Sequence, residues 1–152
     1  MILIADDNED DAVAIVETLK SAGIRNQLRL VGDGREVIAY LKGHEHYGDR
    51  KKHPLPSVLL LDLKMPRLGG FEVLEWLRFS MPAKDILIII LSGHGELGDI
   101  KRGYELGARS FLIKPCHAED IRNLVRAYST YWELEGAPKP SSTGATRDDL
   151  LR

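Results

Sequence analysis

The sequence predicts an α/β fold in which helices cover both faces of a five-stranded parallel sheet. Two continuous apolar runs, Val58–Leu61 and Ile86–Leu91, have the length of strands, and runs of this kind are typical of strands buried on both faces. Segments with helical spacing of apolar residues alternate with the strands, which predicts right-handed crossovers. The 152 residues suit one domain with a sizeable core.

The first half of the chain alternates strand and helix twice. Met1–Ala5 is a short apolar strand, and the helix after it ends at Gly23. Its apolar residues recur at helical spacing: Ala12, Ile15, Val16 and Leu19. Gln27–Val31 is predicted as a second strand, and Val37–Leu41 as a short helix closed by Gly43.

The stretch from His44 to Pro56 is polar, basic and bounded by proline, which predicts a surface loop. It is long for a connection in a compact α/β unit, so we consider it a candidate interaction site. Its histidines, His44, His46 and His53, lack a scaffold of carboxylates. We therefore expect solvated side chains here and not a metal site.

The second half continues the alternation. Helices are predicted over Phe71–Phe79 and Glu96–Leu106, on either side of the strand Ile86–Leu91, and a fifth strand over Arg109–Ile113. The last helix has the clearest period, with apolar residues at Ile121, Leu124, Val125, Tyr128 and Trp132. Trp76 and Trp132 are expected mainly to pack.

The helical pattern ends near Glu135, where Gly136–Ser142 has the composition of a linker. We therefore expect a domain over residues 1–134 and a flexible tail over residues 135–152, in which Asp148–Leu151 is a candidate docking patch.

Composition and charge exclude several classes of function. A formal charge of −2 and a pI near 6.2 give no basic field for nucleic acid. The longest apolar run is too short to span a membrane. The single Cys116 excludes an internal disulfide and a cysteine zinc site, and no His–Asp relay is spaced around it for a nucleophilic role. We expect a cytoplasmic protein.

Polar residues end four of the five predicted strands. Asp6 and Asp7 follow the first, Asp62 ends the third, Ser92 follows the fourth and Lys114 follows the fifth. Each could separately be a helix cap, a turn residue or a solvated terminus. Because the carboxyl ends of parallel strands meet at one edge, where such sheets bind ligands, their convergence favours a functional site.

The residue types at this edge indicate phosphoryl chemistry. Three carboxylates in one crevice repel each other unless a cation neutralises them, and an oxygen-only donor set suits Mg²⁺. A carboxylate beside bound Mg²⁺, faced by an ammonium and a hydroxyl, can attack a phosphoryl group and hold the acyl phosphate.

These residues resemble the receiver domain of two-component response regulators. The resemblance covers about Met1 to Tyr131 and is carried by five motifs in order: Asp6-Asp7, Asp62 with Met65-Pro66 and Gly70, Ser92-Gly93, Gly107-Ala108, and Lys114-Pro115. It implies a flavodoxin-like, doubly wound sheet of strand order 2-1-3-4-5 with five flanking helices. It also implies a phosphoacceptor switch that catalyses only its own phosphotransfer and dephosphorylation.

Carried over residue by residue, the resemblance implies that Asp62 is the phosphoacceptor. Asp6, Asp7, Asp62 and the backbone carbonyl of Lys64 would hold Mg²⁺, for which Mn²⁺ can substitute. Ser92 and Lys114 would bind the phosphoryl oxygens. The residues two places after Asp62 and Ser92 are Lys64 and His94, and such positions tune phosphoryl lifetime in receivers.

The family's switch couples the hydroxyl after the fourth strand to an aromatic residue on the fifth, here Ser92 and Phe111. It implies that phosphorylation changes the face formed by residues 96–106, 109–113 and the last helix. We expect a sensor histidine kinase as partner, of the phytochrome type because of the long loop and the absent effector domain. A homodimer on this face would involve Tyr104, Phe111, Tyr128 and Trp132, with Tyr131 beside them.

Two other classes of function stay open. Aspartyl-phosphate phosphatases also use an aspartate at a strand end, but they need a second aspartate two residues on, where this chain has Lys64. A non-signalling, flavodoxin-like binding module would need a phosphate loop after the first strand, which the sequence lacks.

Overall fold

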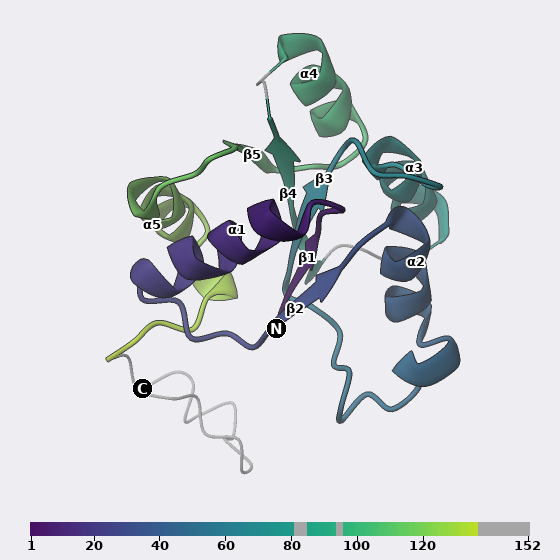
Figure 1. Ribbon diagram of the computed structural model, residues 1–152, viewed down its shortest axis with the longest axis horizontal. Helices are drawn as coiled ribbons and strands as arrows, with labels where there is room; N and C mark the ends of the chain where they lie inside the picture. The colour runs from purple at the N-terminus through teal and green to yellow at the C-terminus, as the bar shows by residue number, and fades with distance from the viewer. Residues whose placement is uncertain (81–84, 94–95, 137–152) are drawn as a thin grey trace.

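The computed structural model describes residues 1–80, 85–93 and 96–136 and confirms the predicted parallel sheet (Figure 1). Its strands pair in the order β2-β1-β3-β4-β5, all parallel. The strands are β1 (Ile2–Ala5), β2 (Leu28–Val31), β3 (Val58–Asp62), β4 (Leu87–Ser92) and β5 (Ser110–Ile113). The predicted order 2-1-3-4-5 is therefore confirmed.

Helices cover both faces of the sheet (Figure 1). They are α1 (Glu9–Ser21), α2 (Gly34–Lys42), α3 (Gly70–Ser80), α4 (Leu97–Glu105) and α5 (Ala118–Ala127). Helices α1 and α5 contact each other on one face, and α2 and α3 contact each other on the opposite face. Among the described residues, no helix is long and apolar enough to cross a membrane.

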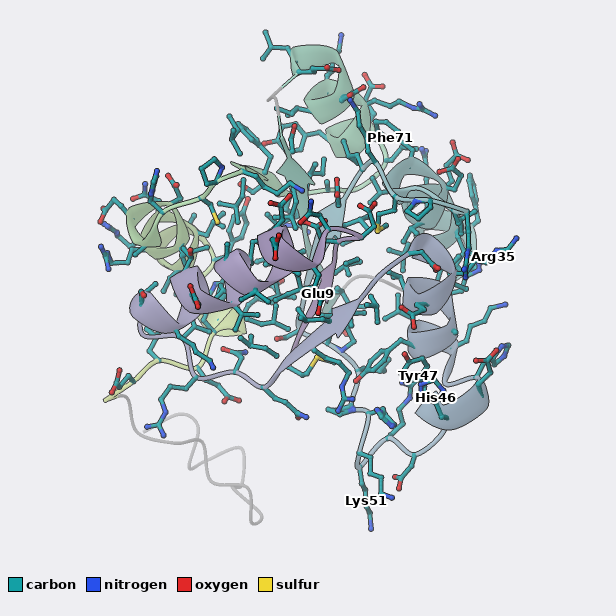
Figure 2. All side chains as sticks on the ribbon, viewed as in Figure 1. Glu9, Arg35, His46, Tyr47, Lys51 and Phe71 are labelled. Carbon is teal, nitrogen blue, oxygen red and sulfur yellow. The ribbon has the colours of Figure 1, made fainter. Side chains whose placement is uncertain are left out.

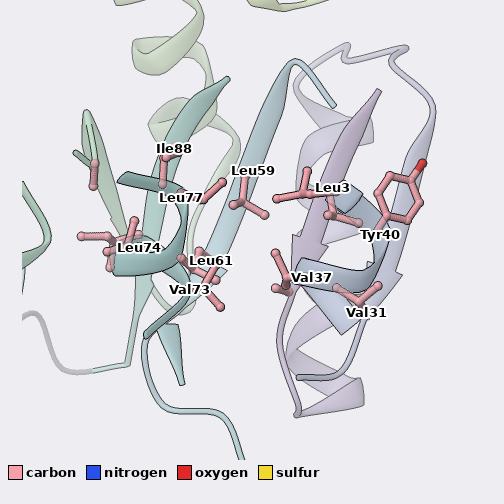
Figure 3. Close-up of a cluster of buried hydrophobic side chains, with 14 of the residues drawn as sticks. Leu3, Val31, Val37, Tyr40, Leu59, Leu61, Val73, Leu74, Leu77 and Ile88 are labelled. Carbon is pink, nitrogen blue, oxygen red and sulfur yellow. The ribbon is translucent and has the colours of Figure 1, made fainter. Parts of the chain in front are cut away.

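The core consists of two apolar clusters because successive side chains of a strand point to opposite faces. Leu59 and Leu61 of β3 join the cluster under α2 and α3, which Figure 3 shows. Val58 and Leu60 join the cluster under α1 and α5. Every residue of β3 is buried, as the sequence predicts for a central parallel strand.

The loop of residues 44–56 is more closely packed than the prediction of a polar surface loop implies. It contains a 3₁₀ turn, η1 (Glu45–Tyr47), in which Tyr47 is buried against Tyr40 of α2. The Arg50 guanidinium donates hydrogen bonds to the carbonyls of Tyr40 and Leu41, at 2.9 and 2.7 Å, and so caps the end of α2. In Figure 2 the loop extends below α2, with Lys51 pointing away from the domain.

The last helix is shorter than its apolar period predicts. Helix α5 ends at Ala127, and a 3₁₀ turn, η3 (Ser129–Tyr131), brings Trp132 into the core cluster that also contains Ile2 and Ile24. Trp132 is only 8% exposed, which confirms that it packs and makes it unavailable for the homodimer contact predicted for it.

After Trp132 the chain runs antiparallel to the segment that precedes β2. Leu134 forms a bridge with Ile24, and the Glu135 amide donates a hydrogen bond of 2.7 Å to the Gly23 carbonyl. This contact lies one residue beyond the domain boundary predicted after residue 134. The rest of the predicted tail, from residue 137, lies outside the described residues.

Candidate functional site

The sheet brings the predicted site residues together at its carboxyl edge. Asp6, Asp7 and Asp62 each offer a carboxylate oxygen, and these oxygens lie within 4.8 Å of one another. Beside them is a small open pocket of about 150 Å³. Asp62, Lys64, Ser92 and Lys114 line this pocket together with Glu96 and Asp99.

Strand register explains this convergence. Ala5 of β1 pairs with Leu61 of β3, so the residues that follow, Asp6 and Asp62, lie side by side. Asn8 caps helix α1 by accepting a hydrogen bond of 3.0 Å from the Asp11 amide. Since Asn8 performs the capping, Asp7 is left at the edge of the sheet with the other carboxylates.

Lys114 is the cation at the centre of the carboxylate cluster. Its Nζ atom lies 2.9 Å from Asp6, 3.1 Å from Asp11 and 3.4 Å from Asp62. Its backbone amide donates a hydrogen bond of 2.7 Å to the Ser92 carbonyl, which ties the end of β5 to the end of β4. The peptide bond that follows, to Pro115, is cis.

Burial sets the protonation chemistry of the site. It raises the pKa of Asp62 to about 6, with a contribution from Asp6, although the Lys64 amide and the Lys114 charge act to lower it. Burial by itself would lower the pKa of Lys114. Hydrogen bonds to Asp6 and Asp11 and the charge of Asp62 outweigh it, so this pKa lies above its usual value and Lys114 stays protonated.

The donor set fits a hard divalent cation. Lys114 pairs with Asp6, Asp11 and Asp62, and Asp7 lies beside two of these carboxylates, so negative charge is in excess at this point. The candidate ligands are all oxygens, which Mg²⁺ and Mn²⁺ accept, and they include neither a thiolate nor an imidazole.

The loop between β3 and α3 is held in place by close backbone contacts. A Cβ atom on Gly70 would lie 2.5 Å from the Asp62 carbonyl oxygen and 2.7 Å from the Leu63 Cα atom. Two further contacts anchor the part of the loop before Gly70: the Gly34 amide donates to the Leu68 carbonyl, and Arg67 pairs with Asp33 at 3.4 Å. These contacts fix the backbone that carries Lys64.

Sequence reasoning missed Asp11, whose carboxylate contacts Lys114 directly. The sequence did offer a signal: Asp11 lies four residues after Asp7. At the start of a helix, side chains four residues apart lie on the same face, so Asp11 could be expected near the carboxylates. It also missed Glu96, which faces the Lys64 ammonium across the pocket at 4.0 Å.

The two predicted switch residues lie on neighbouring strands. Ser92 pairs with Ile113, and Phe111 pairs with Ile90 two positions earlier. The Phe111 ring is 36% exposed and lies edge-on to Tyr104 of α4, with ring centroids 6.4 Å apart. His94, the predicted lifetime-tuning residue, lies outside the described residues.

The remaining candidates, the loop histidines and Cys116, do not join the carboxylate cluster. Rings of His46 and His53 pack against Tyr47, with centroids 4.0 and 5.2 Å away. Cys116 is buried, and burial raises the pKa of its thiol, which disfavours the reactive thiolate.

Sequence comparison connects this arrangement to known proteins. A family model described as "Response regulator receiver domain" matches residues 2–126. The chain is 31% identical over 132 residues to the "Probable methanogenesis regulatory protein FilR2" of Methanothrix harundinacea (strain 6Ac), covering 87% of this chain and 83% of that protein. It is 28% identical over 142 residues to "Response regulator Rcp1" of Synechocystis sp., covering 93% and 94%.

Structural comparison gives a similar set. The "Bacteriophytochrome response regulator RtBRR" superposes with a TM-score of 0.77 at 28% identity, over 93% of this chain and 84% of that one. The Mn²⁺-bound form of Rcp1 superposes with a TM-score of 0.68 at 28% identity, over 92% and 98%.

Proposed function

Because the chain belongs to the response regulator receiver family, whose members act as phosphoacceptor switches, we propose that Asp62 accepts a phosphoryl group from a sensor histidine kinase. One observation carries the assignment to Asp62. This carboxylate ends the central strand, lines the pocket, and lies within reach of both Lys114 and the other two aspartates of the cluster.

The transfer is a displacement at phosphorus. A carboxylate oxygen of Asp62 attacks the phosphorus of a phosphohistidine, the P–N bond breaks, and the imidazole leaves with the bonding electrons. Lys114, 3.4 Å from Asp62, would pair with the phosphoryl oxygens, and Ser92 in the same pocket would donate a hydrogen bond to them. In this proposal the chain catalyses only its own phosphorylation and dephosphorylation.

Asp6, Asp7, Asp62 and the backbone carbonyl of Lys64 would hold Mg²⁺, with Mn²⁺ as a substitute. The cluster geometry and the Mn²⁺-bound form of Rcp1 support this choice. When bound, the ion supplies positive charge to the phosphoryl oxygens during transfer. Without a divalent cation, Lys114 alone would supply positive charge to the phosphoryl oxygens.

The output surface would be the face formed by α4, β5 and α5. We propose that Ser92 turns toward the phosphoryl group and that Phe111 then moves inward from its exposed position beside Tyr104. A homodimer would use Tyr104, Phe111 and Tyr128, without the buried Trp132. Sedimentation across a concentration series tests this: a phosphorylated protein that stays monomeric at high micromolar concentration would contradict it.

The kinase partner that the comparisons favour is of the phytochrome type, since RtBRR is named as a bacteriophytochrome response regulator. Because such kinases use ATP, the switch would operate in the cytoplasm. Transfer from a phytochrome-type kinase should be faster than from an unrelated histidine kinase at equal concentration, and equal rates would contradict the pairing.

Phosphorylation by a small donor tests the core proposal. Incubation with phosphoramidate and Mg²⁺ should add one phosphoryl group to the intact mass of the wild-type chain. Asp62→Asn should add none, whereas the control Asp11→Asn, which changes another carboxylate that contacts Lys114, should still be labelled. A label that persists in Asp62→Asn, or that forms equally in excess chelator, would contradict the proposal.

A further inference from the structure

An apolar groove lies far from the phosphorylation pocket, between α1 and the edge strand β2. It has a volume of about 540 Å³. Val16 and Lys20 of α1, Leu28 and Leu30 of β2, and the connecting residues 24–26 line it. Strand β2 forms one edge of the sheet (Figure 1), so this groove opens to the side of the domain.

Apolar side chains in and next to the groove are only partly covered by the core. Leu28 points toward α1 and packs partly on its cluster. Leu30, two residues on and therefore on the same face, is 44% exposed, and Val13 of α1 is 46% exposed. Helical spacing places Val13, Val16 and Lys20 on one side of α1.

The path of the chain after α5 leads to this groove. Leu134 pairs with Ile24, and the Arg25 backbone amide donates a hydrogen bond of 2.7 Å to the Glu133 carbonyl. Ile24 and Arg25 are themselves lining residues. The chain therefore leaves the described domain, at Gly136, directly beside the groove.

We propose that the segment Asp148–Leu151 of the same chain docks in this groove. This segment lies outside the described residues. Its two leucines match the apolar lining, and its two aspartates match the positive charges of Lys20 and Arg25 at the rim. The proposal is independent of the phosphoacceptor role of Asp62.

The length of chain between Gly136 and Asp148 suits this docking. Eleven residues can span up to about 36 Å when extended, far more than is needed to reach a groove that begins beside Gly136. Tethering through a connection of this length gives an effective concentration of the order of millimolar. Contacts too weak to hold a separate peptide would therefore hold the tethered segment.

Disulfide closure in the full-length chain tests the proposal. The variant Leu30→Cys with Leu151→Cys is equilibrated in glutathione buffer, and its effective molarity of closure is obtained from the oxidised and reduced fractions. The matched control pairs Leu151→Cys with Leu97→Cys, because Leu97 is an exposed leucine on α4. The native Cys116 is buried and is present in both.

We expect the Leu30 pair to close within one chain with an effective molarity at least about tenfold above that of the Leu97 pair. Adding Asp148→Lys and Asp149→Lys should reduce this ratio, and Lys20→Glu with Arg25→Glu should then restore it. Equal effective molarities for the two pairs would overturn the proposal. Charge reversals that leave the ratio of effective molarities unchanged would also overturn it. A product that is mainly a disulfide-linked dimer would overturn it too, because it would assign the groove to a second copy of the chain.

Discussion

When no cation is bound, the burial of Asp62 conflicts with the ionised state that it needs for phosphoryl transfer. Its side chain is buried beside Asp6, which favours the neutral form, yet phosphoryl transfer requires the carboxylate. Lys114 offsets part of this cost but shares its charge with Asp6 and Asp11. The excess negative charge therefore destabilises the metal-free fold and creates affinity for a divalent cation.

This conflict predicts a pH dependence of stability. The pKa of Asp62 is about 6 in the folded protein, whereas an aspartate side chain in the unfolded chain has an ordinary value of 3.8. Between these values the unfolded chain releases the proton and the folded chain keeps it, so the free energy of unfolding falls as pH rises. The loss should reach about 3 kcal/mol once the pH is well above 6, as measured by urea unfolding with a chelator present.

Asp62→Asn serves as the control, because the amide does not titrate. At pH 7.5 this variant should be more stable than the wild type without metal, and its stability should change less between pH 4 and pH 7. Saturating Mg²⁺ should stabilise the wild type more than the variant. Identical pH profiles for the two proteins would contradict the role of Asp62.

At the scale of elements, the site depends on how α3 begins. The helix starts at Gly70, whose backbone lies against Asp62 and Leu63, so the loop carrying Lys64 turns back sharply. Any side chain at position 70 would meet backbone atoms and not the flexible end of another side chain. The phosphoacceptor and the first turn of α3 therefore cannot move independently.

We expect Gly70→Ala to destabilise the protein by roughly 1–3 kcal/mol and to reduce phosphorylation by the small donor. Gly98→Ala is the matched control, since Gly98 lies in α4 with open space around it, and this change should be neutral or stabilising by up to about 1 kcal/mol. Thermal unfolding measures both variants. Gly70→Ala with wild-type stability and labelling would show that the loop can shift freely.

The sequence predicted the bounds of elements whose apolar pattern stops abruptly. It did not predict the bounds of elements whose pattern continues past the end of the element, or the packing of residues outside any pattern. Val58–Asp62 reads as a central strand because it is continuously apolar, and strand order places its carboxylate beside Asp6. The end of α5 was missed because the helical period continues through Tyr128 to Trp132 after the backbone has left the helix. Tyr47 was missed because one aromatic residue in a polar loop carries no period.

At the scale of the whole molecule, the chain after α5 closes the domain. Trp132 joins the cluster under α1 and α5, and the Asn26 side chain links the two segments by donating to the Tyr131 carbonyl and accepting from the Glu133 amide. Sequence alone could not locate these contacts, since they join residues more than a hundred positions apart. Residues 131–133 are thus part of the fold.

Trp132→Ala should therefore lower the free energy of unfolding by about 3–5 kcal/mol, because it opens a cavity in the core. Trp132→Phe should lower it much less. Phe79→Ala, at a side chain that is 81% exposed, should change it by less than about 0.5 kcal/mol. Urea unfolding of the three variants compares these effects. A Trp132→Ala protein as stable as Phe79→Ala would contradict the buried position.

The central claim, that Asp62 forms the acyl phosphate, is tested most directly by reductive trapping. Borohydride reduces an aspartyl phosphate to homoserine, which marks the modified position permanently. After treatment with phosphoramidate and Mg²⁺ and then borohydride, peptide sequencing by mass spectrometry should find homoserine at position 62, and aspartate at positions 6, 7 and 11. Homoserine at one of those three positions, or aspartate retained at position 62 in a phosphorylated sample, would contradict the claim.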